Sequence, residues 1–195
     1  MLAMLERMTV DEYLAFDRAA ERPHEYIAGT PCLREGANFQ HCQINSNVLR
    51  AVGNALQASP FRVYAPPMRV QAGADVYLYP DVSIGFGPAE SGDPHNDILI
   101  NPVVVVEVMS PATELRDRAT KFHQYLRTPS LQTYVLVSQN HAIVECYFRL
   151  PEQRGWLLTD AQGLDSVIHI SGVEIDLPLR EIYDRVEFPT PEGVG

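Results

Sequence analysis

The sequence lacks the segments that place a protein in or across a membrane. No apolar run approaches the ~20 residues that a transmembrane helix needs. Glu6 and Arg7 follow Met4 and Leu5 directly, so the N-terminus does not have the layout of a signal peptide. No repeat or low-complexity stretch interrupts the chain. We therefore expect a cytoplasmic protein without a membrane partner.

Cysteine is scarce and irregularly placed. Cys32, Cys42 and Cys146 are odd in number and have no CxxC spacing, which supports neither a disulfide framework nor a zinc knuckle. We expect them to be buried free thiols.

Two other chemical motifs are missing. His41, His95 and His123 have no mutual metal-ligand spacing such as HxxxH, so we expect each to be solvated or satisfied by its neighbours. Gly85 and Gly87 are not followed by the lysine and the serine or threonine of a phosphate-binding loop. The sequence thus predicts neither a histidine-based metal site nor nucleotide binding by such a loop.

Positive charge is also in short supply. The chain has 15 Lys and Arg against 25 Asp and Glu, a formal net charge of −10. Proteins that hold duplex DNA usually carry clustered positive charge that displaces counterions, so this composition disfavours tight DNA binding. Arg34, Arg50, Arg62 and Arg69 could form a local basic face, or each could be an ordinary solvated charge.

The chain does contain enough apolar residues for one substantial core. Its 195 residues are 46% hydrophobic, and this length favours one domain. We expect a single domain over residues 1–188 and a flexible tail over residues 189–195.

A run of four valines leads directly to an acidic residue. Residues 103–106 are all valine, and Glu107 and Val108 follow. Such a β-branched run is typical of a strand buried on both faces. An unpaired carboxylate there would cost roughly several kcal/mol, so Glu107 needs a cation, a proton or hydrogen-bond donors. A bound metal is one such cation, and a structural ion pair is the alternative.

A second acid and a lysine flank this strand in the sequence. Pro80 is tolerated at the first position of a strand, which predicts that Asp81 enters the sheet near a strand end. Downstream, Thr113 is a candidate helix cap, and Asp117 and Lys121 lie on one helix face at i, i+4. Lys121 then leads back toward the strand pair. Alternatively, Asp117 and Lys121 form a surface pair worth ~0.3–0.5 kcal/mol.

These three residues suit metal-dependent hydrolysis. Magnesium typically uses one or two protein carboxylates together with water and substrate phosphate, a task that Asp81 and Glu107 can perform. A nearby lysine can orient or help to deprotonate the attacking water and offset charge on a phosphate. Phosphodiester hydrolysis requires this arrangement, and it needs no nucleophilic side chain.

Several segments of the chain together resemble a known family. They are residues 8–13 (MTVDEY), 24–29 (HEYIAG), 79–82 (YPDV), 105–111 (VVEVMSP) and 121–131, which contains Lys121, Phe122, Tyr125 and the stretch Pro129-Ser130-Leu131. The pattern resembles the PD-(D/E)XK nuclease superfamily and, within it, the bacterial family of restriction endonucleases of the Uma-two type.

The resemblance implies specific roles. Asp81 and Glu107 match the catalytic, metal-binding acids, and the backbone carbonyl of Val108 matches a further ligand. The superfamily pattern places a lysine two residues after the second acid, where this chain has Met109. The resemblance therefore implies a catalytic lysine relocated to the following helix, Lys121.

Glu25 matches an additional acid of the family. Its implied role is that of a second metal ligand or of a structural pair. The cofactor implied is Mg²⁺ or Mn²⁺, and the fold implied is α/β, with a restriction-endonuclease-like core in which helices flank a mixed central β-sheet.

The pattern of elements agrees with that fold. Thr9 and Glu12 form a capping-box signature that predicts a helix ending near residues 22–23. The polar loop 91–97 joins the strand of Asp81 to that of Glu107, and it could overhang the site or be only a connection. Further predictions are a hairpin at 25–35, helices at 38–58 and 114–127, strands at 61–65, 68–71, 75–79, 81–86, 102–109, 132–138 and 142–149, a C-terminal β-meander, and a last helical turn at 179–183.

The function expected is that of a metal-dependent endonuclease that hydrolyses phosphodiester bonds in DNA. A homodimer is expected because two strands of a duplex must be engaged and because Tyr147, Phe148 and Trp156 make the C-terminal strands apolar. The alternative is a catalytically inactive nuclease-fold protein that acts as a nucleic-acid or protein binding module. The acidic composition favours this alternative, and the pair of acids with a lysine favours the enzyme.

Overall fold

The structure is a computed structural model that describes residues 7–150 and 155–189. Apart from Pro189, the tail predicted over residues 189–195 lies outside the described residues. Residues 1–6, which bear on the prediction that no signal peptide is present, also lie outside them. Among the described residues, no helix combines the length and the apolar character needed to cross a membrane.

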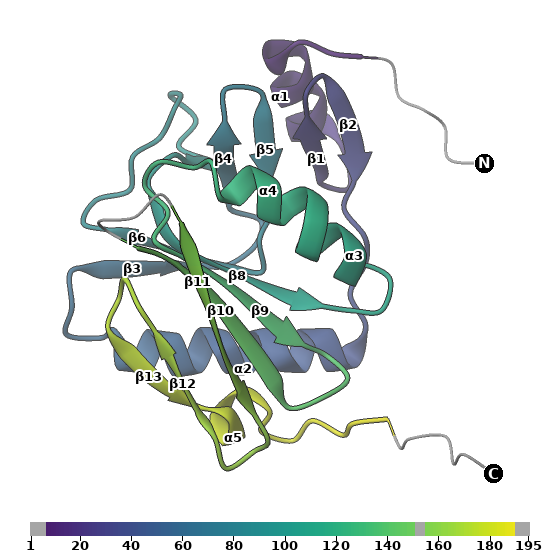
Figure 1. Ribbon diagram of the computed structural model, residues 1–195. Helices are drawn as coiled ribbons and strands as arrows, with labels where there is room; N and C mark the ends of the chain where they lie inside the picture. The colour runs from purple at the N-terminus through teal and green to yellow at the C-terminus, as the bar shows by residue number, and fades with distance from the viewer. Residues whose placement is uncertain (1–6, 151–154, 190–195) are drawn as a thin grey trace.

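Two larger β-sheets and one hairpin make up the strands (Figure 1). The six-stranded sheet has the order β11-β10-β9-β8-β6-β3, with β3 Phe61–Tyr64, β6 Val82–Phe86, β8 Pro102–Met109, β9 Thr133–Ser138, β10 Ile143–Arg149 and β11 Trp156–Gln162. The five-stranded sheet has the order β2-β1-β5-β4-β7, with β1 His24–Ile27, β2 Thr30–Leu33, β4 Arg69–Gly73, β5 Val76–Leu78 and β7 Ile98–Leu99. The hairpin consists of β12 Val167–Ile170 and β13 Ile175–Pro178.

Helices cover both faces of the six-stranded sheet (Figure 1). On one face lies α2 (Phe39–Ala55), beside the hairpin and α5 (Leu179–Ile182). On the other face, one continuous helical segment consists of α3 (Glu114–Arg116), the π-helical turn η1 (Asp117–Lys121) and α4 (Phe122–Tyr125). The sheet is mixed, because β8 and β9 are parallel and the other strand pairs are antiparallel. This is the α/β architecture that the sequence predicted.

The central strand β8 is buried on both faces, as its run of valines predicted. Val104, Val106 and Val108 face the core beneath α2, whereas Val105 and Met109 face the core beneath α4. Successive side chains of a strand alternate between faces, so Glu107 belongs to the α4 face. The strand therefore carries its acidic residue toward the helix that bears Lys121.

Strand positions were predicted better than sheet membership. The predicted strands at 68–71 and 75–79 lie in the five-stranded sheet, apart from the six-stranded one. Pro66 and Pro67 follow β3, and because proline has no N–H to donate to a ladder, the chain leaves the six-stranded sheet there. The C-terminal strands also differ from a single meander. β11 extends the six-stranded sheet by pairing with β10, whereas β12 and β13 pair with each other.

The helix starts follow the capping chemistry of the sequence in one case and depart from it in another. At α1 (Val10–Ala19), Thr9 and Glu12 form the predicted capping box. At α3 the side chain of Thr113 caps nothing, because its Oγ1 accepts a hydrogen bond from the backbone N–H of Ser110. The hydroxyl oxygen of Ser110 instead accepts from the N–H of Thr113, so Ser110 serves this helix start.

Candidate active site

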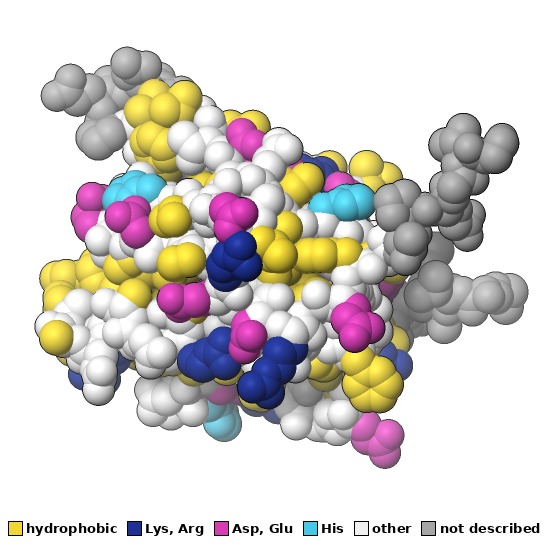
Figure 2. Space-filling view, turned by 90° about the horizontal axis from the view of Figure 1, so that it is seen from below, with side chains coloured by type: hydrophobic (Ala, Val, Ile, Leu, Met, Phe, Trp, Pro, Cys, Tyr) yellow, Lys and Arg dark blue, Asp and Glu magenta, His cyan; other side chains and the backbone are white. Residues whose placement is uncertain are grey.

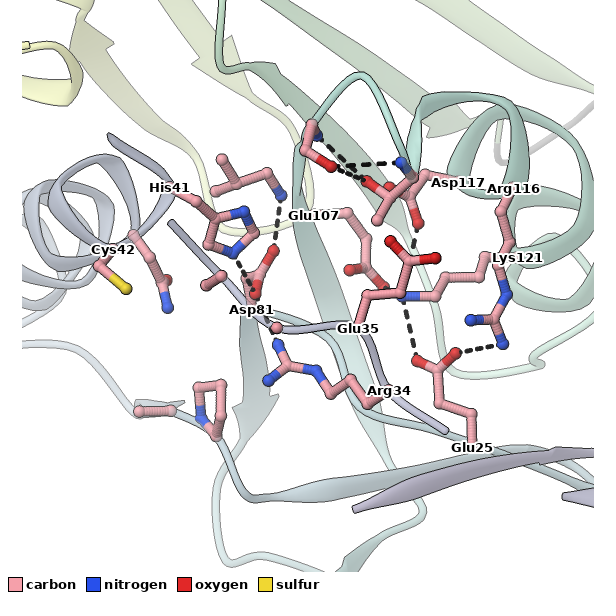
Figure 3. A pocket seen from close by; sticks show the side chains of 18 of the residues that line it. Glu25, Arg34, Glu35, His41, Cys42, Asp81, Glu107, Arg116, Asp117 and Lys121 are labelled. Carbon is pink, nitrogen blue, oxygen red and sulfur yellow. Dashed lines mark hydrogen bonds and ion pairs between the residues drawn. The ribbon is translucent and has the colours of Figure 1, made fainter. Parts of the chain in front are cut away.

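A cavity of about 330 Å³ lies where β6 and β8 meet α2 and the α3–η1 segment. Its walls carry many ionisable side chains (Figure 3). They include Glu25, Arg34, Glu35, His41, Asp81, Glu107, Arg116, Asp117 and Lys121. All four residues predicted to be catalytic, Glu25, Asp81, Glu107 and Lys121, therefore line one cavity.

The register of two neighbouring strands brings the two predicted metal-binding acids together. Val82 of β6 lies opposite Val106 of β8 in an antiparallel pair. Asp81 immediately precedes Val82, and its N–H donates to the Val106 carbonyl at 3.1 Å, beside Glu107. Both acids therefore lie where β6 and β8 run side by side, and both line the cavity.

Asp81 is buried and fully hydrogen-bonded. Its Oδ1 lies 2.7 Å from Arg34 Nη2 and 3.0 Å from His41 Nε2, and its Oδ2 accepts from the Val108 N–H at 2.8 Å. Burial raises the pKa of Asp81, but the hydrogen bond and charge of His41, the charge of Arg34 and the Val108 N–H outweigh it, so the pKa lies below its ordinary value. Asp81 is thus held as a carboxylate by groups from α2 and from the segment before it.

Glu107 is equally buried but less completely satisfied. Its Oε1 accepts hydrogen bonds from Lys121 Nζ at 3.0 Å and from the Tyr125 hydroxyl at 3.2 Å. Its Oε2 accepts no hydrogen bond from any described residue. Burial raises the pKa of Glu107 well above its ordinary value; Lys121 opposes this shift, and Asp117 and Asp81 add to it. An additional cation in the cavity would favour the ionised form of Glu107.

Lys121 is surrounded by acidic groups. Besides Glu107, its Nζ lies 3.1 Å from Glu25 Oε1 and 3.4 Å from Asp117 Oδ1. Burial lowers the pKa of Lys121, but attraction to Glu107, Glu25 and Asp117 more than compensates and keeps the pKa above its ordinary value. The alternative of a surface pair between Asp117 and Lys121 is wrong, because both residues are buried. Lys121 is also the single lysine of the sequence.

Glu25 reaches the same group from the five-stranded sheet. It lies in β1 with no exposed surface, and its Oε1 accepts from the Tyr79 N–H at 3.2 Å. Its Oε2 lies 2.6 Å from Arg116 Nη2, a contact that is an ion pair by distance but does not have hydrogen-bond geometry. The contacts of Glu25 with Lys121 and Arg116 are those of a structural pair, one of its two predicted roles.

The helical segment after β8 brings its polar side chains to the cavity as one stripe. Asp117, Lys121 and Tyr125 are spaced at four-residue intervals, which places them on one face of the segment. The first two bound the π-helical turn η1, a kind of turn that is frequent at functional sites. This stripe faces Glu107, which explains how a lysine placed 14 residues after the acid still contacts it.

The roles of Arg34, His41 and Arg116 in the cavity were not predicted from the sequence. Arg34 and His41 contact Asp81 across 47 and 40 residues of sequence, and no local spacing links them to it. Arg116 follows the same pattern, because its partner Glu25 lies in another sheet. His41 is satisfied by a neighbour, as predicted, but that neighbour is Asp81.

The four arginines considered for a basic face do not form one. Arg34 lies in the cavity, and Arg69 is buried with its Nη2 2.7 Å from Asp17 Oδ2, so neither is an ordinary solvated charge. Arg50 is 3.4 Å from Asp184, and Arg62 is exposed.

The loop at 91–97 does not overhang the cavity. Arg18 of α1 pairs with Asp93 and Asp97 of this loop, which holds the loop against α1. No residue of the loop is among the described residues that line the cavity. The loop is therefore a connection on the α1 side of the molecule.

The free cysteines differ from the prediction in exposure. Cys146 is buried, whereas Cys32 and Cys42 are exposed, and all three are free thiols. Burial raises the pKa of Cys146 to about 12. Cys42 lies in the first turns of α2 at the edge of the cavity.

A metal would have to be held by few side chains. Among the described residues, no group of three or more His, Cys, Asp or Glu side chains is arranged to hold a metal ion. A backbone oxygen is available, however. The pairing of β6 with β8 ends at Val82 and Val106, and carbonyls two residues apart point to the same edge of a strand. The Val108 carbonyl therefore points toward Asp81 beyond the end of the ladder.

Comparison with known proteins shows similarity along most of the chain. Two uncharacterized proteins of Synechocystis sp. (strain ATCC 27184 / PCC 6803 / Kazusa) are related: slr1290 is 26% identical over 187 residues, covering 95% of this chain and 96% of its own, and sll1609 is 28% identical over 176 residues, covering 90% and 99%. A crystal structure described as a putative nuclease belonging to DUF820 from Anabaena variabilis matches with a TM-score of 0.75 at 20% identity, covering 92% of this chain and 99% of that one.

At 20% identity the structural likeness shows the fold alone, which is the nuclease-like α/β fold predicted from the sequence. The family is identified by a sequence model. The model of Uma2, described as "Putative restriction endonuclease", matches residues 10–180. Because this match spans most of the sequence, the chain belongs to the Uma2 family.

Proposed function

We propose that this protein is a metal-dependent endonuclease that hydrolyses phosphodiester bonds in DNA, with Mg²⁺ or Mn²⁺ as cofactor. One observation carries the proposal: Asp81 and Glu107 come from neighbouring strands and share a single cavity with Lys121 and Glu25. Membership of a family described as "Putative restriction endonuclease" supports the same reaction class.

The groups in the cavity fit a hard divalent cation. Such cations take oxygen ligands, and Asp81, the unpartnered Oε2 of Glu107 and the Val108 carbonyl would provide them. The charge balance agrees, because the cavity is lined by five acidic side chains but by only three lysine and arginine side chains, Arg34, Arg116 and Lys121. When bound, the cation would supply an activated water and stabilise charge on the phosphate.

Lys121 would act through its fixed positive charge. Its contacts with Glu25 and Asp117 hold the ammonium in place without help from solvent. A preorganised cation of this kind would orient the attacking water and stabilise the charge that develops on the phosphate. Glu25 would be a positioning residue for Lys121 in this arrangement.

Arg34 would change its partner when a cation binds. Without a cation, Arg34 and His41 both contact Asp81 Oδ1, the oxygen that a bound cation would neutralise in their place. Arg34 lies in the segment between β2 and α2, and its side chain is 25% exposed. Once released from Asp81, its guanidinium would bind a substrate phosphate at the cavity, where bidentate contacts are favourable.

One observation favours the second candidate, an inactive binding module of the same fold. Both oxygens of Asp81 are already engaged, by Arg34, His41 and the Val108 N–H. A site in which a guanidinium permanently neutralises the first acid would keep its structure without metal. The two candidates therefore differ in whether a cation displaces Arg34.

Nicking of plasmid DNA and calorimetric titration with Mn²⁺ test the proposal together. Wild type should nick DNA when Mg²⁺ or Mn²⁺ is present and stop in a chelator. Glu107→Gln should lower cleavage by about 10²–10³, the scale for loss of one preorganised electrostatic group. The matched control is Glu114→Gln, which changes an exposed glutamate of α3 and should cleave as wild type does.

Two results would count against the enzyme. Equal nicking by wild type, Glu107→Gln and Glu114→Gln would indicate a contaminating nuclease. No nicking by wild type on any DNA tested, together with no heat of Mn²⁺ binding, would favour the binding module.

A further inference from the structure

A large apolar side chain stands in solvent beside the cavity. Phe39, the first residue of α2, is 97% exposed. Cys42 lies one turn after Phe39 and lines the cavity. Phe39 therefore lies beside the proposed active site.

The two helix starts face each other across a second, smaller hollow. This hollow of about 250 Å³ is lined by residues 35–38 and His41 on one side and by residues 110–112 on the other. It adjoins the larger cavity, because Glu35, His41 and Ser110 line both. In Figure 1 the first turns of α2 and α3 lie on the same side of the molecule, near the ends of β8 and β9. A ligand that enters the cavity from this side passes the first turn of α2, which contains Phe39.

The cations near the cavity opening are enough to bind only a few phosphate groups. Arg34 and Arg116 are the partly exposed cations of the cavity, with 25% and 26% of their side-chain surface exposed. On the face shown in Figure 2, Lys and Arg side chains are interspersed with acidic ones and form no continuous field. The formal net charge of −10 agrees. Duplex DNA is usually held through many phosphate contacts, which these groups do not provide.

A ligand that binds through its bases, by contact with an aromatic ring, depends less on phosphate contacts and therefore needs fewer cations. Stacking of a base on an aromatic ring is worth ~1–3 kcal/mol per base and requires a base face that is free of its own neighbours. A ring 97% exposed at the first turn of a helix offers such a platform. Unpaired strands, splayed ends and flaps present free base faces, whereas a continuous duplex does not.

We propose that the site takes a nucleic-acid strand with unpaired bases, one of which stacks on Phe39. This inference rests on the proposed function and specifies its substrate class. Base stacking supplies the affinity, and Arg34 and Arg116 position the phosphates at the cavity.

Fluorescence anisotropy in a chelator tests binding apart from cleavage. The probes are a labelled oligothymidylate of about 12 nucleotides, within the site sizes known for stacking grooves, an abasic strand of the same length, and a duplex of the same length. Wild type should bind the thymidylate strand at least about tenfold more tightly than the duplex. Phe39→Ala should weaken this binding by about 5- to 100-fold, the range that one lost stacking contact predicts.

Two variants and one probe make the result specific. Phe39→Trp should restore binding, because it returns an aromatic platform. Phe86→Ala removes another exposed phenylalanine, 57% exposed at the end of β6, and should bind as wild type does. The abasic strand should bind wild type weakly, and Phe39→Ala should weaken it no further, because no base remains to stack.

Equal or tighter binding of the duplex would overturn the inference, as would unchanged binding by Phe39→Ala or no binding of any probe by wild type. These outcomes are distinct from failure of the proposed function. A protein that binds the single strand through Phe39 but cleaves nothing would keep this inference and lose the hydrolysis.

Discussion

At the scale of single residues, the site depends on one ammonium group among three buried carboxylates. Lys121 contacts Glu25, Glu107 and Asp117 within 3.4 Å. Removing one partner of a buried ion pair leaves an uncompensated charge, which is far more destabilising than losing a surface pair. Lys121 therefore has a structural role in addition to the catalytic role proposed for it.

Lys121→Ala should reduce the free energy of unfolding by about 3–5 kcal/mol, because three carboxylates lose their shared cation. Urea unfolding measures this loss. The matched control is Arg118→Ala, which removes a more exposed cation that pairs with Glu114 and Glu145 and should cost about 1 kcal/mol or less. Added Mn²⁺ should restore part of the stability of Lys121→Ala if a cation binds beside Glu107. Similar losses in both variants would show that the charge on Lys121 is not needed for folding.

The acids of the site could be predicted, but their arginine and histidine partners could not. Pro80 marks the strand entry that positions Asp81, and the valine run makes the burial of Glu107 visible in the sequence. Arg34 lies in the segment between β2 and α2, and His41 lies in α2, so both reach Asp81 only through the packing of these elements against the sheet. Such tertiary packing leaves no periodic signal.

At the scale of elements, an arginine clamp attaches the loop between β6 and β7 to α1. Arg18 donates from Nε at 2.9 Å and from Nη2 at 2.8 Å to the two carboxylate oxygens of Asp97, and Arg69 Nη1 lies 3.2 Å from Asp97 Oδ2. The hydrogen bond from Arg18 lowers the pKa of Asp97 most, burial opposes it, and Arg69 adds to the lowering, which brings the pKa from 3.8 to about 2.

The stabilisation from this clamp should depend on pH in the acid range. Because the folded state lowers the pKa of Asp97, the stabilisation is complete above the unfolded value of 3.8 and is lost as the pH falls through about 2. Asp97→Asn should therefore be less stable than wild type at about pH 6, and the difference should shrink toward about pH 2. Urea midpoints across this range measure it.

The control for this prediction is Asp160→Asn, which changes an exposed aspartate of β11. Its stability relative to wild type should not change over the same pH range. A constant difference between wild type and Asp97→Asn at every pH would show that the clamp acts through packing rather than through charge.

The positions of the strands were easier to predict than the neighbouring strands with which they pair. The continuous run of valines located β8 at the residues observed, because a strand's pattern is local. Which strands pair within one sheet depends on the direction in which the chain continues after each turn. The two-residue strand β7 was not predicted, since Ile98 and Leu99 are too short a run to have a period, and they pair in parallel with β4.

At the scale of the whole molecule, a homodimer remains our proposal. Two of the three residues first considered for its interface are engaged within the chain: Tyr147 packs on Phe122 with ring centroids 4.4 Å apart, and Arg149 lies 4.7 Å over the Trp156 ring. The neighbouring Leu157 and Leu158 are 46% and 48% exposed on β11, an edge strand of the six-stranded sheet. A twofold axis beside β11 would place the free edges of two copies of this strand side by side.

Light scattering at micromolar concentration should therefore give twice the chain mass of 21.8 kDa. Leu158→Arg should return a monomer, because it places charge on the strand edge without disturbing the core. The exposed Leu164 lies outside β11, so Leu164→Arg serves as the control and should remain dimeric. A wild-type mass of 21.8 kDa alone would end the dimer proposal.

Because Lys121 is the only lysine of the sequence, acylating reagents can modify one side-chain amine, and that amine is buried in the cavity. Its acylation requires the ion pairs to open, so the rate of labelling, read by mass spectrometry, reports how often the site opens, much as hydrogen exchange reports local unfolding. A metal or a strand that closes the cavity would slow the labelling of Lys121 and leave that of the terminal amine unchanged. The chain thus contains its own occupancy reporter, which needs no engineered label and no turnover.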